Sequence, residues 1–372
     1  MAAVVISGSG LFTPPYAVSN EALVAAFNAH VDLVNGTNQA AIARGEQQPL
    51  LYSSCEFIEK ASGIKSRFLM DAEGVLDPER LCPRLPVRSD DELSLMVEMA
   101  LVAAREALAA ARVEAAEIDL VIVAASNMER AYPAIAVELQ QALGAGGYAF
   151  DMNVACASAT FALSTAADAI ASGAASRALL VNPEICSAHA NFADRDSHFI
   201  FGDGCAALLV EREDLCRIAQ PFKVEGRQLL TQFSNNIRNN AGFLGRCRPP
   251  QAPAAELFRQ NGRKVFKEVL PLVVDLIEGL MARHGLASEQ LARLWLHQAN
   301  GTMNQFIARK VLGREPDEGN APTILDRYGN TSSAGSVIAF HLHHQDLAAG
   351  SHAILCAFGA GYSAGAVLLR RL

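Results

Sequence analysis

The stretch Asp151–Thr160 (DMNVACASAT) contains a cysteine, Cys156, between an expected strand and an expected helix. The strand covers Ala149–Val154, and the Ala-rich segment Ala159–Ser172 predicts the helix. A thiol close to a helix start lies near free backbone N–H groups and the positive end of the helix dipole, which favour the thiolate. The thiolate is the form that attacks an acyl carbonyl. Cys156 is therefore a candidate nucleophile, although most cysteines are simply small buried apolar residues.

Strands and helices alternate on both sides of this stretch. The expected strands are Ile118–Ala125, Ala149–Val154, Arg177–Val181, Leu291–Leu296 and Ala353–Phe358. The expected helices are Leu93–Ala111, Ala134–Leu143, Ala159–Ser172, Val265–His284, Gln305–Leu312 and Ser333–His344. This alternation predicts an α/β fold with a largely parallel sheet.

Two pairs of segments recur in the same order in each half of the chain. Phe201–Glu211 (FGDGCAALLVE) resembles Phe358–Arg370 (FGAGYSAGAVLLR), and Asp119–Asn127 (DLVIVAASN) resembles Arg293–Asn300 (RLWLHQAN). Either pair alone could arise by chance, because a glycine turn followed by an apolar strand is common. Together they predict a duplicated α/β fold.

Composition and charge exclude several classes of protein. The chain has 372 residues, of which 51% are hydrophobic and 19% charged, so a large core is feasible. The net charge of −8, without a run of Lys or Arg, argues against nucleic acid as a partner. Gly8 and Gly10 interrupt the apolar N-terminal stretch, so a first strand is expected there and not a signal peptide. Apolar runs are too short for a membrane span.

The eight cysteines include no CxxC pair. That spacing argues against a zinc site or a disulfide framework, and no metal is expected. Free cysteines are typical of a reducing compartment, so we expect a cytoplasmic protein.

Two later polar residues strengthen the case for Cys156. His297 follows the expected strand Leu291–Leu296, and the carboxyl end of such a strand faces the crevice where α/β sheets bind ligands. Asn330 lies in Gly329–Ser336 (GNTSSAGS), a loop of small residues that enters a helix. Taken alone, His297 could be an ordinary hydrogen-bonded histidine, and Asn330 an ordinary turn residue or N-cap.

The three motifs resemble, in order and approximate spacing, the Cys–His–Asn triad of β-ketoacyl-acyl-carrier-protein synthase III, the initiating condensing enzyme of fatty-acid synthesis. They are Cys156 in DMNVACASA, His297 in HQAN and Asn330 in GNTSSAGS. Further likenesses to that family extend over nearly the whole chain. They are Glu56–Arg67, Phe201–Gly204, Asn261–Lys267 and Phe358–Gly361.

The resemblance implies a thiolase-like fold, in which two similar halves stack as five α-β-α-β-α layers, usually in a homodimer. We expect the first half to span residues 1–215, with the nucleophilic cysteine and insertions at about 31–52 and 72–90. The second half would span residues 216–372, with the histidine and the asparagine. The insertions could cover the entrance to the acyl site, or they could be inert surface additions.

The resemblance also implies a mechanism. Cys156 would accept an acyl group from acyl-CoA, and a malonyl group on an acyl carrier protein would then lose carbon dioxide. His297 and Asn330 would stabilise the resulting enolate, and the backbone N–H groups of Cys156 and Ala360 would form the oxyanion hole. The implied activity needs no cofactor beyond its thioester substrates.

Four further residues are expected to contact substrate by the same resemblance: Phe57, Tyr132, Phe201 and Asn300. Phe57 occupies the position of a Trp that grips the coenzyme A nucleotide, and Tyr132 the position that reaches into the partner subunit's acyl pocket. The family's nucleotide-binding Arg residues are replaced here. Their positions hold Ala61, Ala188 and Thr302, and the nearest basic substitutes are Lys60, Lys65, Arg67, Arg246 and Arg248.

Other activities fit less well. A thiolase needs a second cysteine in the C-terminal glycine turn, but Phe358–Gly365 (FGAGYSAG) has none and Cys356 precedes it. A hydroxymethylglutaryl-type synthase would use a glutamate; Glu129 is available, but the HQAN motif and Asn330 fit decarboxylation better. A non-catalytic chain-length factor would lack the cysteine. A specialised acyltransferase of secondary metabolism on the same scaffold stays open, because the Arg residues are replaced.

Overall fold

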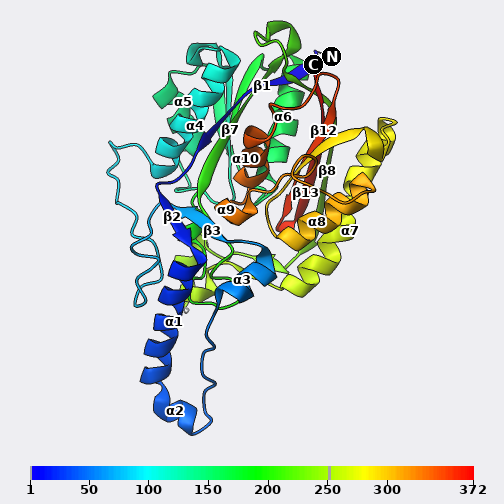
Figure 1. The fold of residues 1–372 in the computed structure, drawn as a ribbon. Helices are drawn as coiled ribbons and strands as arrows, with labels where there is room; N and C mark the ends of the chain where they lie inside the picture. Colours follow the sequence, from blue (N-terminus) through cyan, green and yellow to red (C-terminus); the bar gives the residue numbers. More distant parts are fainter. Residues whose placement is uncertain (1, 250–252) are drawn as a thin grey trace.

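The computed structural model describes residues 2–249 and 253–372 (Figure 1). Within these residues, the main sheet has nine strands in the order β11-β12-β13-β8-β1-β7-β6-β4-β5. The strands of the first half are β1 (Val4–Phe12), β4 (Leu120–Ala124), β5 (Tyr148–Met152), β6 (Arg177–Glu184) and β7 (Gly204–Arg212). Those of the second half are β8 (Phe222–Ser234), β11 (Leu291–Leu296), β12 (His352–Gly359) and β13 (Gly361–Arg371).

Both halves repeat one strand pattern outward from the middle of the sheet. β1 pairs antiparallel with β7, β7 antiparallel with β6, and β6 parallel with β4. In the same way, β8 pairs antiparallel with β13, β13 antiparallel with β12, and β12 parallel with β11. β7 thus corresponds to β13 and β4 to β11, which are the segments that the sequence repeats. This symmetry supports the proposed division into residues 1–215 and 216–372.

Helices form three layers around the two halves of the sheet (Figure 1). The helices of these layers are α4 (Leu95–Ala111), α5 (Ile135–Leu143), α6 (Ser158–Ser172), α7 (Gly262–Arg283), α8 (Gly301–Leu312) and α10 (Ala334–Leu342). α4 and α5 pack on the first half, and α7 and α8 on the second, each pair with its own hydrophobic core. α6 and α10 lie between the halves and contact strands of both. The layers follow the predicted α-β-α-β-α order.

The sequence of α6 suits its central place. Its buried positions include Ala159, Ala162, Ala166 and Ala167, all in the core shared by the two halves. Small side chains let a helix approach two sheet faces closely while the interior stays densely packed. The Ala-rich run next to Cys156 therefore fixes the nucleophile loop between the halves.

Further elements outside these layers complete the fold. They are β2 (Tyr16–Ser19), α1 (Asn20–Thr37), α2 (Gln39–Ala43), α3 (Cys55–Ser62), β3 (Ser66–Leu69), β9 (Ile237–Arg238), β10 (Arg259–Gln260) and α9 (Leu325–Tyr328). Short 3-10 helices occur at Ala115–Glu117, Cys186–Ala188, Glu213–Leu215, Phe243–Cys247, Pro253–Ala255 and Ser288–Gln290.

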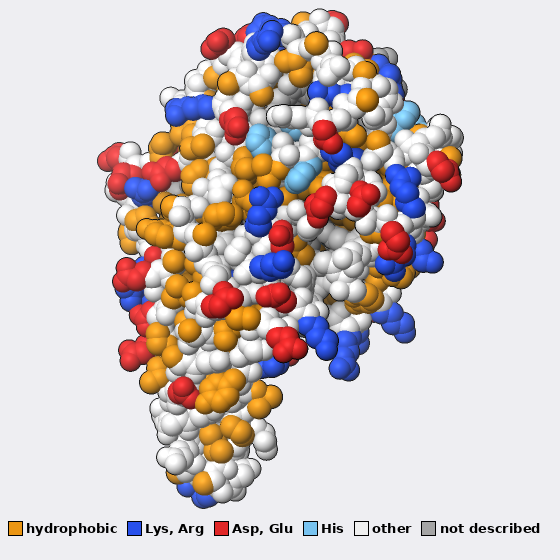
Figure 2. Space-filling view, in the orientation of Figure 1, with side chains coloured by type: hydrophobic (Ala, Val, Ile, Leu, Met, Phe, Trp, Pro, Cys, Tyr) orange, Lys and Arg blue, Asp and Glu red, His pale blue; other side chains and the backbone are white. Residues whose placement is uncertain are grey.

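The two predicted insertions lie next to each other. The end of α1, α2 and the returning chain form an arm, residues 32–52, that projects from the body (Figure 1). Hydrophobic side chains are visible on the arm (Figure 2). Two hydrophobic residues at its end, Leu51 and Tyr52, are exposed. The second insertion forms a loop beside α1, where His30 Nδ1 lies 2.8 Å from Pro78 O. In the described part of the chain, no helix is long and apolar enough to cross a membrane.

Candidate active site

A cavity of about 520 Å³ brings the three predicted catalytic residues together. Cys156, His297 and Asn330 come from three separate parts of the chain, and all three line it. Phe201 and Asn300, predicted to contact substrate, line it as well. Neither insertion contributes to the described wall, so the suggestion that they cover the entrance gains no support from this structure.

Cys156 lies two residues before α6 and is only partly exposed. Burial raises the pKa of the Cys156 thiol to about 11, although Ser332 and the backbone N–H groups of Cys156 and Ala360 act in the opposite direction. Ser332 Oγ donates a hydrogen bond to Cys156 Sγ over 3.4 Å. Burial therefore outweighs the nearby donors, and the thiol ionises less readily than its place before α6 alone indicates. The thiol instead lies among donors that would stabilise negative charge during attack.

His297 follows β11 and is buried. Its backbone N–H donates to Cys356 O over 2.8 Å, and its ring packs edge-on against Phe358 with centroids 5.3 Å apart. Burial lowers the pKa of His297 to about 4, while a backbone contact with Ser332 acts the other way. The imidazole is thus neutral near pH 7. Within the described structure, its buried Nδ1 atom has no hydrogen-bond partner.

Asn330 is held on both its backbone and its side chain. Its backbone N–H donates to Ile200 O over 2.9 Å, and its carbonyl accepts from Gly202 N over 3.2 Å. Its side-chain Oδ1 accepts from Ser332 N over 2.9 Å. Because Oδ1 is occupied in this way, the Nδ2 amino group remains to donate to a bound molecule.

The predicted oxyanion hole lies where β12 turns into β13. A Cβ atom on Gly359 would come within 2.6 Å of Cys156 Cβ, so only glycine lets the turn approach the nucleophile. This close approach brings the N–H of the next residue, Ala360, to the sulfur, where it lowers the pKa of Cys156.

The remaining residues that were predicted to contact substrate either lie outside the cavity wall or already bond to other parts of the chain. Asn300 caps α8 by accepting from Met303 N over 3.2 Å, and its Nδ2 donates to Ala61 O over 2.7 Å. Phe57 lies outside the described wall of the cavity, and so does Tyr132, whose exposed fraction is 85%. A contact of Tyr132 with a partner subunit stays a prediction.

Sequence reasoning missed one arginine near Phe57. The Arg195 guanidinium lies 3.9 Å from the centroid of the Phe57 ring, and its Nε donates to Tyr52 O over 2.7 Å. No motif marks Arg195, because the chain brings it to Phe57 from a distant loop. By contrast, the suggested substitute Arg67 is buried and bonds to Val18 O, Asn20 Oδ1 and Phe199 O, so it cannot reach a nucleotide.

Exposed basic side chains gather on one face near α7. Arg263, which lines the cavity, and Lys264 and Lys267 lie exposed in the first turns of α7. Figure 2 shows Lys and Arg side chains gathered near the lower end of α7. Arg246 and Arg248 are exposed in the loop between β9 and β10. The described wall of the cavity itself has one basic residue, Arg263, and one acidic residue, Asp196.

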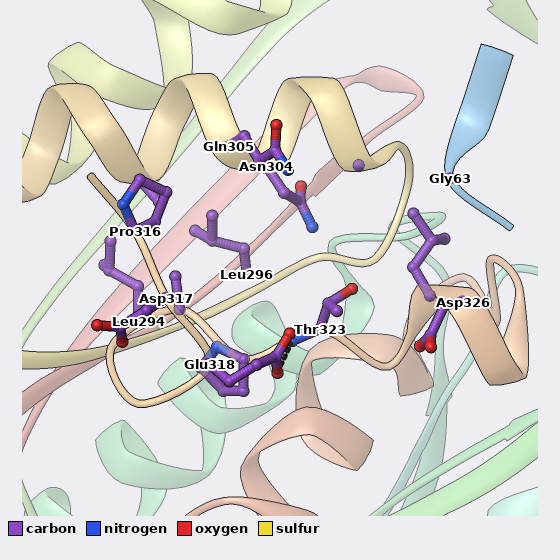
Figure 3. A pocket seen from close by; sticks show the side chains of 15 residues that line it. Gly63, Leu294, Leu296, Asn304, Gln305, Pro316, Asp317, Glu318, Thr323 and Asp326 are labelled. Atoms are coloured by element: carbon purple, nitrogen blue, oxygen red, sulfur yellow. Dashed lines mark hydrogen bonds between the residues drawn. The ribbon is translucent and has the colours of Figure 1, made fainter. Parts of the chain in front are cut away.

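A second cavity, of about 480 Å³, lies on the other side of α8. Figure 3 shows Asn304 pointing into it from α8, opposite a loop that contains Asp317 and Glu318. Cys156, His297 and Asn330 lie outside its wall, so it is separate from the candidate site. Among the described residues, no group of three or more His, Cys, Asp or Glu side chains is placed to hold a metal ion.

Known proteins resemble the chain over most of its length. Residues 150–222 match the family model of 3-oxoacyl-[acyl-carrier-protein] synthase III, and residues 281–371 match the model of its C-terminal part. The first matched segment contains Cys156, and the second contains His297 and Asn330.

Individual relatives extend this likeness. The chain is 56% identical to β-ketodecanoyl-[acyl-carrier-protein] synthase of Pseudomonas aeruginosa, over 93% of this chain and 99% of the relative. It is 32% identical to β-ketoacyl-[acyl-carrier-protein] synthase III of Rubrobacter xylanophilus, over 81% and 92% of the two chains. The crystal structure of 3-oxoacyl-[acyl-carrier-protein] synthase III from Aquifex aeolicus superposes with a TM-score of 0.75 at 26% identity, over 99% of both chains.

Proposed function

Since this chain belongs to the 3-oxoacyl-[acyl-carrier-protein] synthase III family and is an acyltransferase of the condensing type, we propose that Cys156, His297 and Asn330 are its catalytic residues. The predicted resemblance and the thiolase-like fold are thereby confirmed. One observation supports this assignment above all: the three residues belong to distant segments of the chain and yet line the same cavity.

The first step loads Cys156. Its sulfur attacks the carbonyl carbon of an acyl thioester, the thiol proton leaves with the departing coenzyme A sulfur, and an acyl-cysteine forms. The N–H groups of Cys156 and Ala360 donate to the oxyanion. Burial raises the pKa of this thiol, while Ser332 and the backbone N–H groups of Cys156 and Ala360 act in the opposite direction, as donors that favour charge on the sulfur during attack. Of the residues described near the sulfur, Ser332 adds a further donor.

The second step forms the carbon–carbon bond. A malonyl thioester enters, and its thioester oxygen accepts hydrogen bonds from the neutral His297 ring and from Asn330 Nδ2. Loss of carbon dioxide leaves an enolate that these donors stabilise. The enolate carbon attacks the acyl-cysteine carbonyl. The β-ketoacyl thioester departs, and Cys156 regains a proton. Decarboxylation supplies the carbanion, so this step requires no general base.

The acyl group that we propose has eight carbons. The relative at 56% identity is named for a β-ketodecanoyl product, which has ten carbons. Condensation with a malonyl unit adds two carbons, so an octanoyl thioester would give that product. We assign the same product class to this chain on the strength of that identity.

The proposed carriers follow from two groups of side chains near the cavity. Phe57 with Arg195 offers a flat, charged surface for the nucleotide of coenzyme A, so we assign octanoyl-CoA as donor. Exposed Arg263, Lys264 and Lys267 suit an acidic carrier protein that presents the malonyl group. We further propose a homodimer and, because all eight cysteines are free thiols, a cytoplasmic location.

Intact-mass spectrometry tests this function. The protein is mixed with acyl-CoAs from two to sixteen carbons, and malonyl-acyl carrier protein is then added. We expect an octanoyl adduct that is absent in Cys156→Ala, followed by loss of the adduct and release of carbon dioxide. No adduct with any thioester would refute the acyl-enzyme. Loss of the adduct to another nucleophile without carbon dioxide would favour the specialised acyltransferase.

A further inference from the structure

Glu184 is a buried carboxylate at the end of β6, behind the candidate active site. Its Oε1 atom accepts from Ser126 N over 2.9 Å and from Ser333 N over 3.1 Å, and its Oε2 atom accepts from Ser126 Oγ over 2.6 Å. Ser333 Oγ lies within hydrogen-bonding distance of Glu184 Oε1 and of Ala124 O. Burial raises the pKa of Glu184, while the N–H and hydroxyl groups of Ser126 and Ser333 act in the opposite direction and satisfy both oxygens of its side chain.

These contacts join the two loops that contain Cys156 and Asn330. On one side, Asn153 Nδ2 donates to Ser126 O over 2.9 Å, and Asn153 is three residues before the nucleophile. On the other side, Ser333 is three residues after Asn330 and directly precedes α10. Glu184 thus links the nucleophile loop of the first half to the amide loop of the second.

Both loops contain a residue in an unfavourable backbone conformation. Ala155 has φ +48° and Ser332 has φ +47°, in the left-handed region that non-glycine residues rarely adopt. Such residues persist where surrounding contacts hold them in place. Ser332 lies next to Ser333, so the amide and hydroxyl contacts of Ser333 with Glu184 hold the strained turn directly. Ala155 is held separately, since its carbonyl accepts from Ser158 Oγ over 2.7 Å.

We infer that Glu184 is a positioning residue for decarboxylation, which holds Asn330 and Ser332 in their places beside Cys156. The inference rests on the proposed roles of Cys156, His297 and Asn330. Glu184 touches the Asn330 loop directly but reaches the nucleophile loop only through Ser126. Its loss should therefore slow the condensation step much more than the loading of Cys156.

Glu184→Ala is the decisive variant. Alanine removes both carboxylate oxygens, so the N–H groups of Ser126 and Ser333 lose their shared acceptor and the link between the two loops is broken. Two rates are measured on the same protein: acylation of Cys156 by octanoyl-CoA, by quenched intact mass, and release of carbon dioxide by the acyl-enzyme with malonyl-acyl carrier protein. We expect condensation to fall about 100-fold, as small misplacements of catalytic groups do. Acylation should fall less than about tenfold.

Glu211→Ala is the matched control, because Glu211 is also a buried carboxylate on the same sheet but pairs with Arg177 away from the site. It should leave the ratio of the two rates unchanged. Ser333→Ala removes a single hydroxyl and tests the same link if Glu184→Ala fails to fold. It should shift the ratio in the same direction by about tenfold.

Equal loss of both rates in Glu184→Ala, or condensation in that variant within threefold of the unmodified protein, would overturn the inference. If only Ser333→Ala folds, an unchanged ratio of condensation rate to acylation rate in that variant would overturn the inference as well. Failure of the proposed function would look different, because the unmodified protein would then form no acyl-enzyme or release no carbon dioxide.

Discussion

The charge state of His297 determines how the condensation step depends on pH. Burial disfavours the imidazolium, so the pKa of His297 is lowered from its usual value near 6.5 to about 4. The ring therefore stays neutral from about pH 5.5 upward. We expect the rate of a preformed acyl-enzyme with malonyl-acyl carrier protein to show no ionisation of His297 between about pH 5.5 and 7.5.

His297→Ala provides the reference for this pH profile. It removes one donor to the enolate and should slow condensation by about 10²–10³-fold. Ionisations of the substrate or the carrier affect the unmodified protein and His297→Ala alike. The ratio of their condensation rates therefore reports the ionisation of His297 alone. A ratio that changes with a midpoint near 6.5 would show that His297 titrates as an exposed histidine does.

Arg195 is a second residue whose role can be isolated. Its guanidinium stacks on Phe57 beside the cavity, at a place suited to the coenzyme A nucleotide. Arg195→Ala should raise KM for octanoyl-CoA about tenfold, the range expected for a cation–π contact, and leave kcat nearly unchanged. The octanoyl thioester of N-acetylcysteamine lacks the nucleotide, so its KM should not change. Equal effects on both donors would contradict the assignment.

Arg44→Ala is the control, since Arg44 is an exposed arginine on the arm that pairs with Glu46. This variant should change KM neither for octanoyl-CoA nor for the octanoyl thioester of N-acetylcysteamine.

The candidate site could be predicted where its residues lie in short local motifs. Cys156, His297 and Asn330 each follow or precede a regular element, and the sequence around each is distinctive. Arg195 and Glu184 could not be predicted, because their partners are distant in the chain and nothing in the neighbouring residues marks them. The raised thiol pKa was also missed, since a helix start indicates nearby donors but not the depth of burial.

The arm, residues 32–52, is the element that can be shortened with the least effect on the folded core. Every residue from Asp32 to Tyr52 is exposed or half-buried, and the arm is closed at its base by Asn28, whose side chain bonds to the backbone of Ser53. Replacing residues 35–50 by a short Gly-Ser turn should leave Tm within about 3 °C, because shortening a surface loop changes little in the folded core. Calorimetry checks this expectation.

The same deletion tests whether the arm serves catalysis. It contributes nothing to the described wall of the cavity, so acylation by octanoyl-CoA should stay within about twofold of the full chain. A large loss with acyl-CoA would revive the suggestion that the arm covers the entrance. A loss confined to malonyl-acyl carrier protein would place a carrier contact on the arm.

Elements with strong periodicity were predicted closely. The strand Leu291–Leu296 has the expected bounds, and α6 begins one residue before its expected start. Other elements begin or end at residues different from the predicted ones, for physical reasons. α8 begins at Gly301 and not at Gln305, because Asn300 caps it. The first strand after α6 extends beyond Val181 to Glu184, where the bonds of the buried carboxylate fix its end.

At the scale of the whole molecule, the duplication was predictable because two repeated segments fall on equivalent strands. The contacts between the two halves could not be predicted in this way. α6 and α10 must each fit two sheet faces, and the loops of both halves meet through Glu184. Such contacts join residues that are far apart in the chain, and periodicity carries no information about them.

The two ends of the sheet differ, and this difference predicts the dimer. At one end, β11 is shielded by a loop, since Leu294 N donates to Asn320 O over 2.8 Å. At the other end, β5 pairs only with β4 among the described residues. An open edge strand favours pairing with another chain. We therefore expect two copies to join along β5, which would also bring Tyr132 toward the partner.

Ala149→Pro tests this interface. Tyr148 N donates inward to Asp119 O over 3.2 Å, so the N–H of Ala149 points to the open side. Proline there removes an outward donor and leaves the bonds to β4 in place. Light scattering should show a dimer for the unmodified protein and for Ala149→Val, which keeps the N–H, but a monomer for Ala149→Pro. A stable Ala149→Pro dimer would mean that another surface joins the subunits, and Tyr132 would then lose its expected place beside a partner's acyl group.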